Sequence, residues 1–163
     1  MTEMTQVLAS CWKRLGGAVL DGLIALAINF PVMFAAGIFA QIVEGKTMTT
    51  GQIIFFFFFG LAVFLAVNGY LLAKHGQTVG KWIVGTQIVD KDTGQILPLG
   101  KVFGLRYLPI SIVSQIPVLG GLLCSVEVLF IFREDKRCVH DLIAGTRVVD
   151  VRAPKPVAES EVV

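Results

Sequence analysis

The sequence predicts an α-helical integral membrane protein with two transmembrane helices, a third apolar segment and a small cytoplasmic β element. The chain of 163 residues is 55% hydrophobic and only 16% charged, whereas soluble domains are about 45–50% apolar and about 25% charged. Its apolar residues gather in three long runs, and a short polar–apolar pattern occurs twice between and after them. Together these observations place the chain in a lipid bilayer.

The same composition excludes several classes of protein. Disorder requires low hydrophobicity, and the three cysteines are an odd number at long spacings, which argues against a disulfide scaffold. A net charge of +2 and the lack of a basic stripe argue against nucleic acid as a partner. The sequence contains no phosphate-binding loop and no nucleophile motif. We therefore expect a protein without enzymatic activity and without a cofactor.

Two of the apolar runs are long enough to span a membrane. The first covers residues 15–43 and is interrupted by Asp21, Asn29 and Pro31. We expect it to be a retained transmembrane helix, because its apolar stretch is too long for a signal peptide. The second covers residues 52–73 and contains five consecutive phenylalanines. It fits a single span of about 20 residues.

The third run, residues 107–132, allows two interpretations. Pro117 and the glycine pair at 120–121 divide it into halves too short to span alone. It forms either a re-entrant hairpin, entered and left from the cytoplasmic side, or a plain third span. Lysine and arginine precede the first run, occur repeatedly within residues 74–106 and occur again after residue 132. This pattern predicts a cytoplasmic N-terminus, and it favours the hairpin because the tail is also basic.

An internal repeat predicts the β element. Residues 83–90 and 143–150 share the pattern Gly-Thr followed by a polar residue, two β-branched residues and an aspartate. We expect residues 82–90 and 143–150 to form paired strands at the cytoplasmic surface. Residues 99–106 should form a short amphipathic helix with Lys101 and Arg106 toward the lipid headgroups.

Three polar positions resemble a known family. Arg14 opens the first helix, Asp21 lies inside it, and Asp141 belongs to the stretch His-Asp-Leu-Ile-Ala-Gly-Thr at residues 140–146. This order is similar to that of the RDD family of small membrane proteins, and the resemblance extends from about residue 9 to residue 150. It implies one membrane domain over residues 1–150, followed by a polar, disordered tail over 151–163. It also implies location in the bacterial inner (cell) membrane and a role in transport, since some members are described as sodium/proton antiporters.

The polar residues suggest two overlapping groups. Arg14, Asp21 and Asp141 should form one polar network at the cytoplasmic boundary of the membrane. If the third run is a hairpin, Asp21, Asn68 and Glu127 reach a similar depth and would form an ion or proton site, because paired carboxylates exchange a proton for a hard cation.

A structural role for Asp21 is the alternative to ion binding. The aspartate would then pair with a cation such as Arg106 or Arg137, since Arg14 lies about 10.5 Å away along the helix. Asp141 itself would cap the following turn or pair with Arg137. Cys138 and His140 are too weak a pattern to predict a metal site.

Two functional hypotheses follow from these residues. The first is transport of an ion or small ligand, as cation/proton exchange by a homo-oligomer, because so few spans cannot enclose a pathway. The alternative is a non-catalytic scaffold or assembly partner of a larger membrane complex, whose basic face meets anionic lipid or other membrane proteins.

Overall fold

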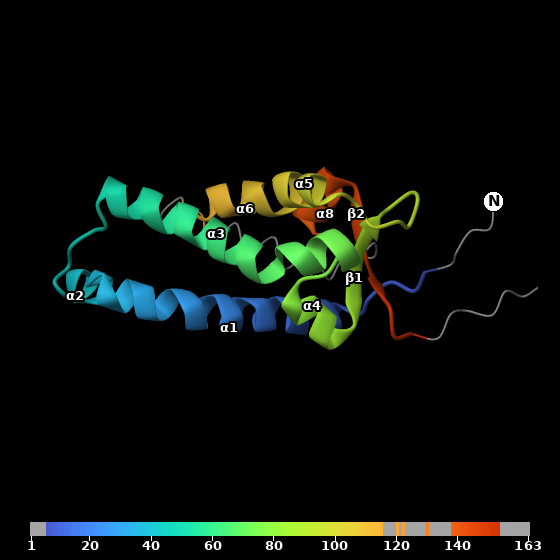
Figure 1. The fold of residues 1–163 in the computed structure, drawn as a ribbon, viewed down its shortest axis with the longest axis horizontal. Coiled ribbons are helices and arrows are strands. Elements are labelled where there is room, and N and C mark those ends of the chain that lie inside the picture. The colour runs from blue at the N-terminus through green and yellow to red at the C-terminus, as the bar shows by residue number, and fades with distance from the viewer. Residues whose placement is uncertain (1–5, 116–119, 121, 123–129, 131–137, 154–163) are drawn as a thin grey trace, which may run out of the picture.

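Two long helices run side by side along the molecule (Figure 1). The computed structural model describes residues 6–115, 120, 122, 130 and 138–153. Helix α1 (Cys11–Ala35) begins after Ser10, whose hydroxyl accepts the Lys13 amide N–H. Helix α3 (Thr50–His75) begins with a reciprocal cap between Thr49 and Gln52. Both helices are long and apolar enough to cross a membrane, and they coincide with the two predicted spans.

The first apolar run is not one continuous helix. Helix α1 ends at Ala35, and a separate short helix, α2 (Ile38–Val43), follows. Gly37 between them adopts φ 68°, a left-handed conformation that a side chain would strain. The chain therefore turns here, and α2 and the following loop connect the two spans at the end opposite the sheet (Figure 1).

A helix–strand unit occurs twice. The first copy is α4 (Val79–Val84) followed by β1 (Thr86–Asp90), and the second is α8 (Val139–Ala144) followed by β2 (Thr146–Asp150). In each copy a glycine with positive φ joins the helix to the strand. The predicted strands thus began too early, because the residues before each glycine complete a helical turn. The β-branched residues after it are extended.

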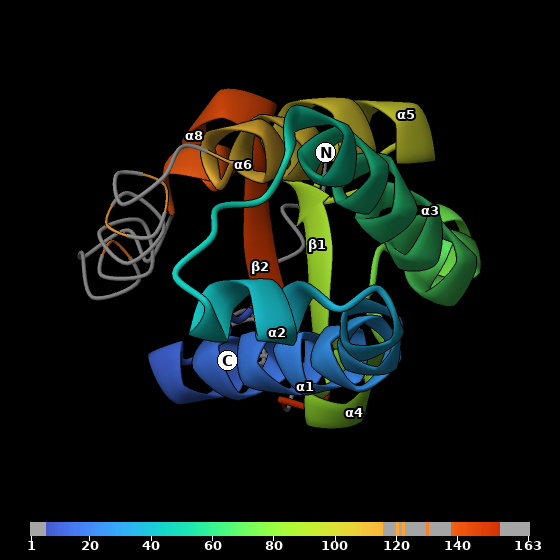
Figure 2. The same ribbon diagram turned by 90° about the vertical axis from the view of Figure 1, so that its left-hand side faces the viewer.

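The two strands form an antiparallel pair. Thr86 lies opposite Asp150, and Ile88 lies opposite Val148. The segment before α1 joins the same sheet, through a bridge between Leu8 and Val149. Figure 2, which looks along the long helices, shows the strands crossing from the α1 side to the α5 and α8 side. The N-terminal segment and the second helix–strand unit therefore lie at one end of the spans.

A second stretch of helix leads into the third apolar run. It comprises α5 (Leu99–Val102), a π-helical turn η1 (Phe103–Tyr107) and α6 (Leu108–Val113). The predicted surface helix is present, but Arg106 does not point to the headgroups, because its side chain is only 3% exposed. The part of the third run that decides between hairpin and span, including Pro117, lies outside the described residues.

The packed core is small and lies at the sheet end. Ile88 and Val148 of the sheet pack there with Leu72 of α3 and Val102 of α5. Away from this end, large apolar side chains such as Phe58 stay exposed. Apolar surface of this extent on two long helices is typical of contact with lipid.

Candidate functional site

A buried ion cluster centres on Asp141, near the start of α8. The side chain of Asp141 is fully buried and forms ion pairs with Arg14 of α1 and Arg106 of η1. The Thr146 hydroxyl donates to the same carboxylate over 2.9 Å, and the Cys138 amide N–H donates to it over 3.2 Å. The carboxylate therefore caps its own helix, as expected from the sequence, and also binds two cations. Arg137, the other expected partner, lies outside the described residues.

The electrostatics keep this cluster charged. Burial by itself raises the pKa of the Asp141 carboxyl, but Arg106, His140 and Arg14 outweigh it and hold that pKa well below its ordinary value. Burial lowers the pKa of Arg106, and the adjacent Asp141 carboxylate more than restores it. The charges persist at neutral pH, so the cluster joins α1, η1 and α8 through fixed ion pairs.

Asp21 belongs to a second cluster, one that α4 completes. Its carboxylate accepts a short hydrogen bond from the Thr78 hydroxyl and a 2.7 Å bond from the Gly80 amide N–H. The Lys81 ammonium lies 3.8 Å from the same carboxylate. The backbones approach closely here, since a Cβ atom on Gly80 would lie 2.2 Å from the Gly17 carbonyl oxygen. Asp21 thus fixes the start of α4 against α1.

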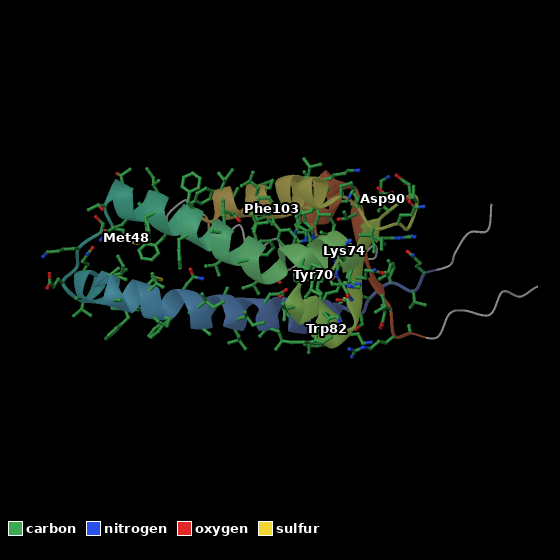
Figure 3. All side chains as sticks on the ribbon, in the orientation of Figure 1. Met48, Tyr70, Lys74, Trp82, Asp90 and Phe103 are labelled. Atoms are coloured by element: carbon green, nitrogen blue, oxygen red, sulfur yellow. The ribbon has the colours of Figure 1, made fainter. Side chains whose placement is uncertain are left out.

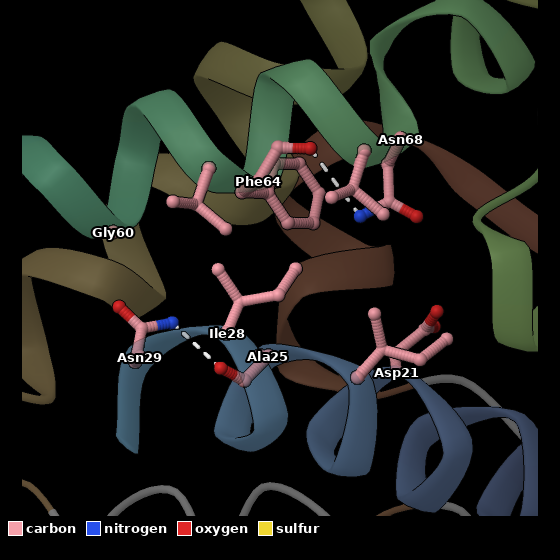
Figure 4. A pocket seen from close by; sticks show the side chains of 10 residues that line it. Asp21, Ala25, Ile28, Asn29, Gly60, Phe64 and Asn68 are labelled. Atoms are coloured by element: carbon pink, nitrogen blue, oxygen red, sulfur yellow. Dashed lines mark hydrogen bonds between the residues drawn. The ribbon is translucent and has the colours of Figure 1, made fainter. Parts of the chain in front are cut away.

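Asn68 supports the same short helix from the other span. Its side-chain oxygen accepts the Val79 amide N–H over 2.9 Å, and its amide group donates to the Phe64 carbonyl. Asp21 and Asn68 line a small cavity of about 60 Å³ between α1 and α3, and Figure 4 shows them facing it from the two helices. Two of the three residues expected to form an ion site thus line one cavity, while the third, Glu127, lies outside the described residues.

The structure divides the predicted three-residue network. Arg14 and Asp141 meet in the first cluster, whereas Asp21 lies about 10.5 Å farther along α1 and contacts α4 instead. Arg106, one of the two cations suggested as a partner of Asp21, pairs with Asp141 instead. The reason is that η1 packs against α8, which brings the arginine to the other carboxylate.

A larger cavity of about 250 Å³ connects the two clusters. Its charged lining comes from four segments: Arg14 and Asp21 of α1, Lys81 of α4, Arg106 of η1 and His140 of α8. Sequence reasoning missed Lys81 as a partner of Asp21. An aspartate inside an apolar run implies a nearby cation, but spacing alone does not select which one.

Cys138, His140 and Asp141 bring ligand-type atoms within 4.8 Å of one another. The Asp141 carboxylate, however, is already neutralised by two guanidinium groups. A metal ion there would face both arginines at short range. We therefore assign no metal to this cluster.

Two apolar spans joined at one end by a small sheet and buried ion pairs define a helical integral membrane protein. The chain belongs to the RDD family, whose model matches residues 8–145. It is 34% identical over 140 residues to an uncharacterized protein, YckC, of Bacillus subtilis (strain 168), covering 86% of this chain and 83% of that protein. An uncharacterized protein of Haemophilus influenzae is 27% identical over 143 residues, covering 86% of this chain and 77% of the relative. No solved structure matches the chain.

Proposed function

We propose that this RDD protein is a non-catalytic membrane transport component that binds a small charged solute at one end of its two spans. The observation that carries the proposal is the cavity of about 250 Å³ lined by charged side chains from α1, α4, η1 and α8. Ionisable groups at membrane depth are costly and commonly mark solute pathways. The volume lies below that of drug-sized pockets, about 300–1,000 Å³, and suits a small ion or a headgroup.

The sheet end is proposed to face the cytoplasm, across a bacterial inner membrane. Trp12, Tyr70 and Trp82 are exposed, and Figure 3 shows Tyr70, Trp82 and Lys74 in the half of the molecule that holds the sheet. Aromatic side chains of this kind gather at the membrane interface, and lysine and arginine gather on the cytoplasmic side. At the opposite end, Lys46 pairs with Glu44.

The two chain ends provide the test of this orientation. Cysteines placed at Thr5 and Ser160 should both resist an impermeant thiol reagent in sealed cells, with Cys11, Cys124 and Cys138 first replaced by serine. A cysteine at Thr47, between the spans, should react and serves as the positive control. Labelling at position 160 alone would contradict the hairpin, and labelling at both ends would contradict the orientation.

A re-entrant third segment has support from the residues on either side of it. Turn η1, where the run begins, packs against α8, which follows the run. The chain therefore starts and ends this passage at the same place. A chain that leaves and returns at the same place crosses the membrane twice or not at all. A re-entrant hairpin, which does not cross it, needs the fewest residues.

Transport would require a homo-oligomer. Two spans cannot surround a solute pathway, and α3 leaves Phe55 and Phe58 exposed for contact with a second copy. Exchange of a cation for a proton has less support than binding of a solute in the larger cavity. Both Asp21 oxygens already accept hydrogen bonds, and the Asn68 oxygen is taken by the Val79 amide N–H.

A flux assay tests the proposal directly. Purified protein in sealed liposomes should move a charged solute down an imposed gradient, with sodium, protons, phosphate and chloride compared at equal ionic strength. Empty liposomes provide the baseline, and Arg106→Gln should abolish the flux while Lys91→Gln leaves it unchanged. Flux no greater than that of empty liposomes for every solute would reject transport.

A scaffold role is the second candidate. Exposed lysines at the sheet end, including Lys74 and Lys91, would attract anionic lipid or an acidic partner at about 1 kcal/mol per charge. Under this role, neutralising these exposed lysines should weaken association with the partner complex, and changing the buried cavity residues should not.

A further inference from the structure

We propose that the cavity takes a phosphate group, either a free phosphate ion or the headgroup of an anionic lipid. This inference rests on the cavity put forward above as the functional site, and it names the class of ligand. Three observations carry it: the balance of charge around the cavity, the surroundings of Lys81, and two buried polar atoms without partners.

The described charges around the cavity sum to a positive value. Arg14, Lys81 and Arg106 contribute three cations, while Asp21 and Asp141 contribute two carboxylates. The balance is positive even with His140 neutral. All three cations are nearly buried, with residue exposures of 9% or less. A buried excess of positive charge is costly unless an anion compensates it.

Lys81 has donors to spare. Its only ion pair within the described part of the chain is to Asp21 at 3.8 Å, beyond the length of a hydrogen bond. An ammonium group carries three donors and no acceptor. The side chain is about nine-tenths buried and lines the cavity, so an acceptor within the cavity is the group that would satisfy it.

Four side-chain polar atoms are buried without a hydrogen-bond partner among the described residues, and two of them, Arg106 Nε and Tyr107 Oη, belong to adjacent residues of η1. Both residues line the same cavity. Buried polar groups are rarely left unpaired, and each exception calls for a cause such as a ligand. Arg106 also lies in a π-helical turn, a distortion found frequently at functional sites.

These groups select the chemistry of the ligand. Lysine, arginine and the tyrosine hydroxyl all donate, so the ligand must offer several acceptor oxygens and negative charge. A phosphate group offers both, and arginine and lysine are its usual partners. Phe64 and Ile110 also line the cavity, so a headgroup would enter with its acyl chains toward the spans.

Binding to the purified protein in a zwitterionic detergent tests the inference. Inorganic phosphate is titrated calorimetrically against sodium chloride of equal ionic strength. Phosphatidylglycerol is compared with phosphatidylcholine by native mass spectrometry. Lys81→Gln should weaken binding roughly tenfold or more, whereas the matched control Lys74→Gln, at an exposed lysine of α3, should change it less than twofold. Lys81→Arg keeps the charge and should retain most of the binding.

Acetylation of the unchanged protein keeps the test valid if Lys81→Gln fails to fold. Bound phosphate or phosphatidylglycerol should protect Lys81 from an amine reagent and leave Lys74 reactive. Protection by phosphate identifies a free ion, and protection by phosphatidylglycerol alone identifies a lipid. Equal effects at the two lysines, or no protection by either ligand, would overturn the inference. Binding of phosphate or lipid without flux would support the anion site and reject transport. Flux without protection of Lys81 would support transport and reject the anion site.

Discussion

The two helix–strand units share a backbone and differ in charge at an equivalent position. In α4 the third helical residue is Lys81, and in α8 it is Asp141. An acidic group suits the start of a helix, where amide N–H groups lack partners, and a lysine does not. Asp141 accordingly accepts the amide N–H of Cys138 in its own unit.

The first unit has a local cap in Thr78, whose hydroxyl accepts the Lys81 amide N–H, and it obtains two further acceptors from the spans. Asp21 of α1 accepts the Gly80 N–H, and Asn68 of α3 accepts the Val79 N–H. These contacts attach α4 to both long helices. The second unit is attached by ion pairs to Arg14 and Arg106. Opposite charges in one repeated unit therefore produce two different attachments, one by capping and one by ion pairing.

Removing the charge of Asp141 should have the largest effect. Asp141→Asn leaves Arg14 and Arg106 buried without a counterion, which should lower the free energy of unfolding by about 3–5 kcal/mol. Thermal unfolding in detergent measures the change. Asp92→Asn, at an exposed aspartate, is the control and should shift the midpoint by less than 1 °C. Equal midpoints for the two variants would show that the ion cluster contributes little.

Acid should remove the same contribution from the unchanged protein. The pKa of Asp141 is lowered by folding, so its stabilising effect is complete above the unfolded pKa of about 3.9. That effect is lost as the pH falls through the lower pKa of the folded state. The difference in melting temperature between the unchanged protein and Asp141→Asn should therefore shrink as the pH falls below about 4. A difference that grew below that pH would contradict this sign.

The close contact between α1 and α4 can be broken without touching a charge. A Cβ atom on Gly80 would meet the Gly17 carbonyl oxygen and the Asp21 carboxylate, so Gly80→Ala should cost about 1–3 kcal/mol despite the better helix propensity of alanine. Gly22→Ala in α1 is the matched control, because its Cβ would have no neighbour within 4 Å. The control should be neutral or slightly stabilising, as measured by the same unfolding assay.

Neutralising Asp21 should lower the stability less than neutralising Asp141. The Asp21 side chain is 20% exposed, and the asparagine that replaces it can still accept hydrogen bonds. Asp21→Asn should cost about 1.5–3 kcal/mol through loss of bonds to a charged acceptor, and it should also lower the oligomer fraction in size-exclusion chromatography. Adding Lys81→Gln should recover part of the loss, since no unpaired charge then remains. A stable, fully assembled Asp21→Asn protein that no longer transports would instead identify a transport carboxylate.

Part of this architecture could be predicted from the sequence. The two spans were correct because residues that face lipid must be apolar over a length set by the bilayer. The two paired strands were predicted in the right places but too long, since the helical turn before Gly85 and before Gly145 leaves no distinctive pattern in six residues. Their register came only from the structure. The association of Asp21 with Asn68 was predicted from equal depth in the membrane, which helix geometry determines from residue number alone.

The sequence by itself therefore determined the class, the two spans, the repeated unit and the residues whose charge must be compensated. Only the tertiary structure decided which partners compensate them: Lys81 for Asp21, and Arg14 with Arg106 for Asp141. The physical reason is that apolar length and strand alternation are local properties of the chain. An ion pair depends on the approach of distant segments, here the packing of α4 on α1 and of η1 on α8.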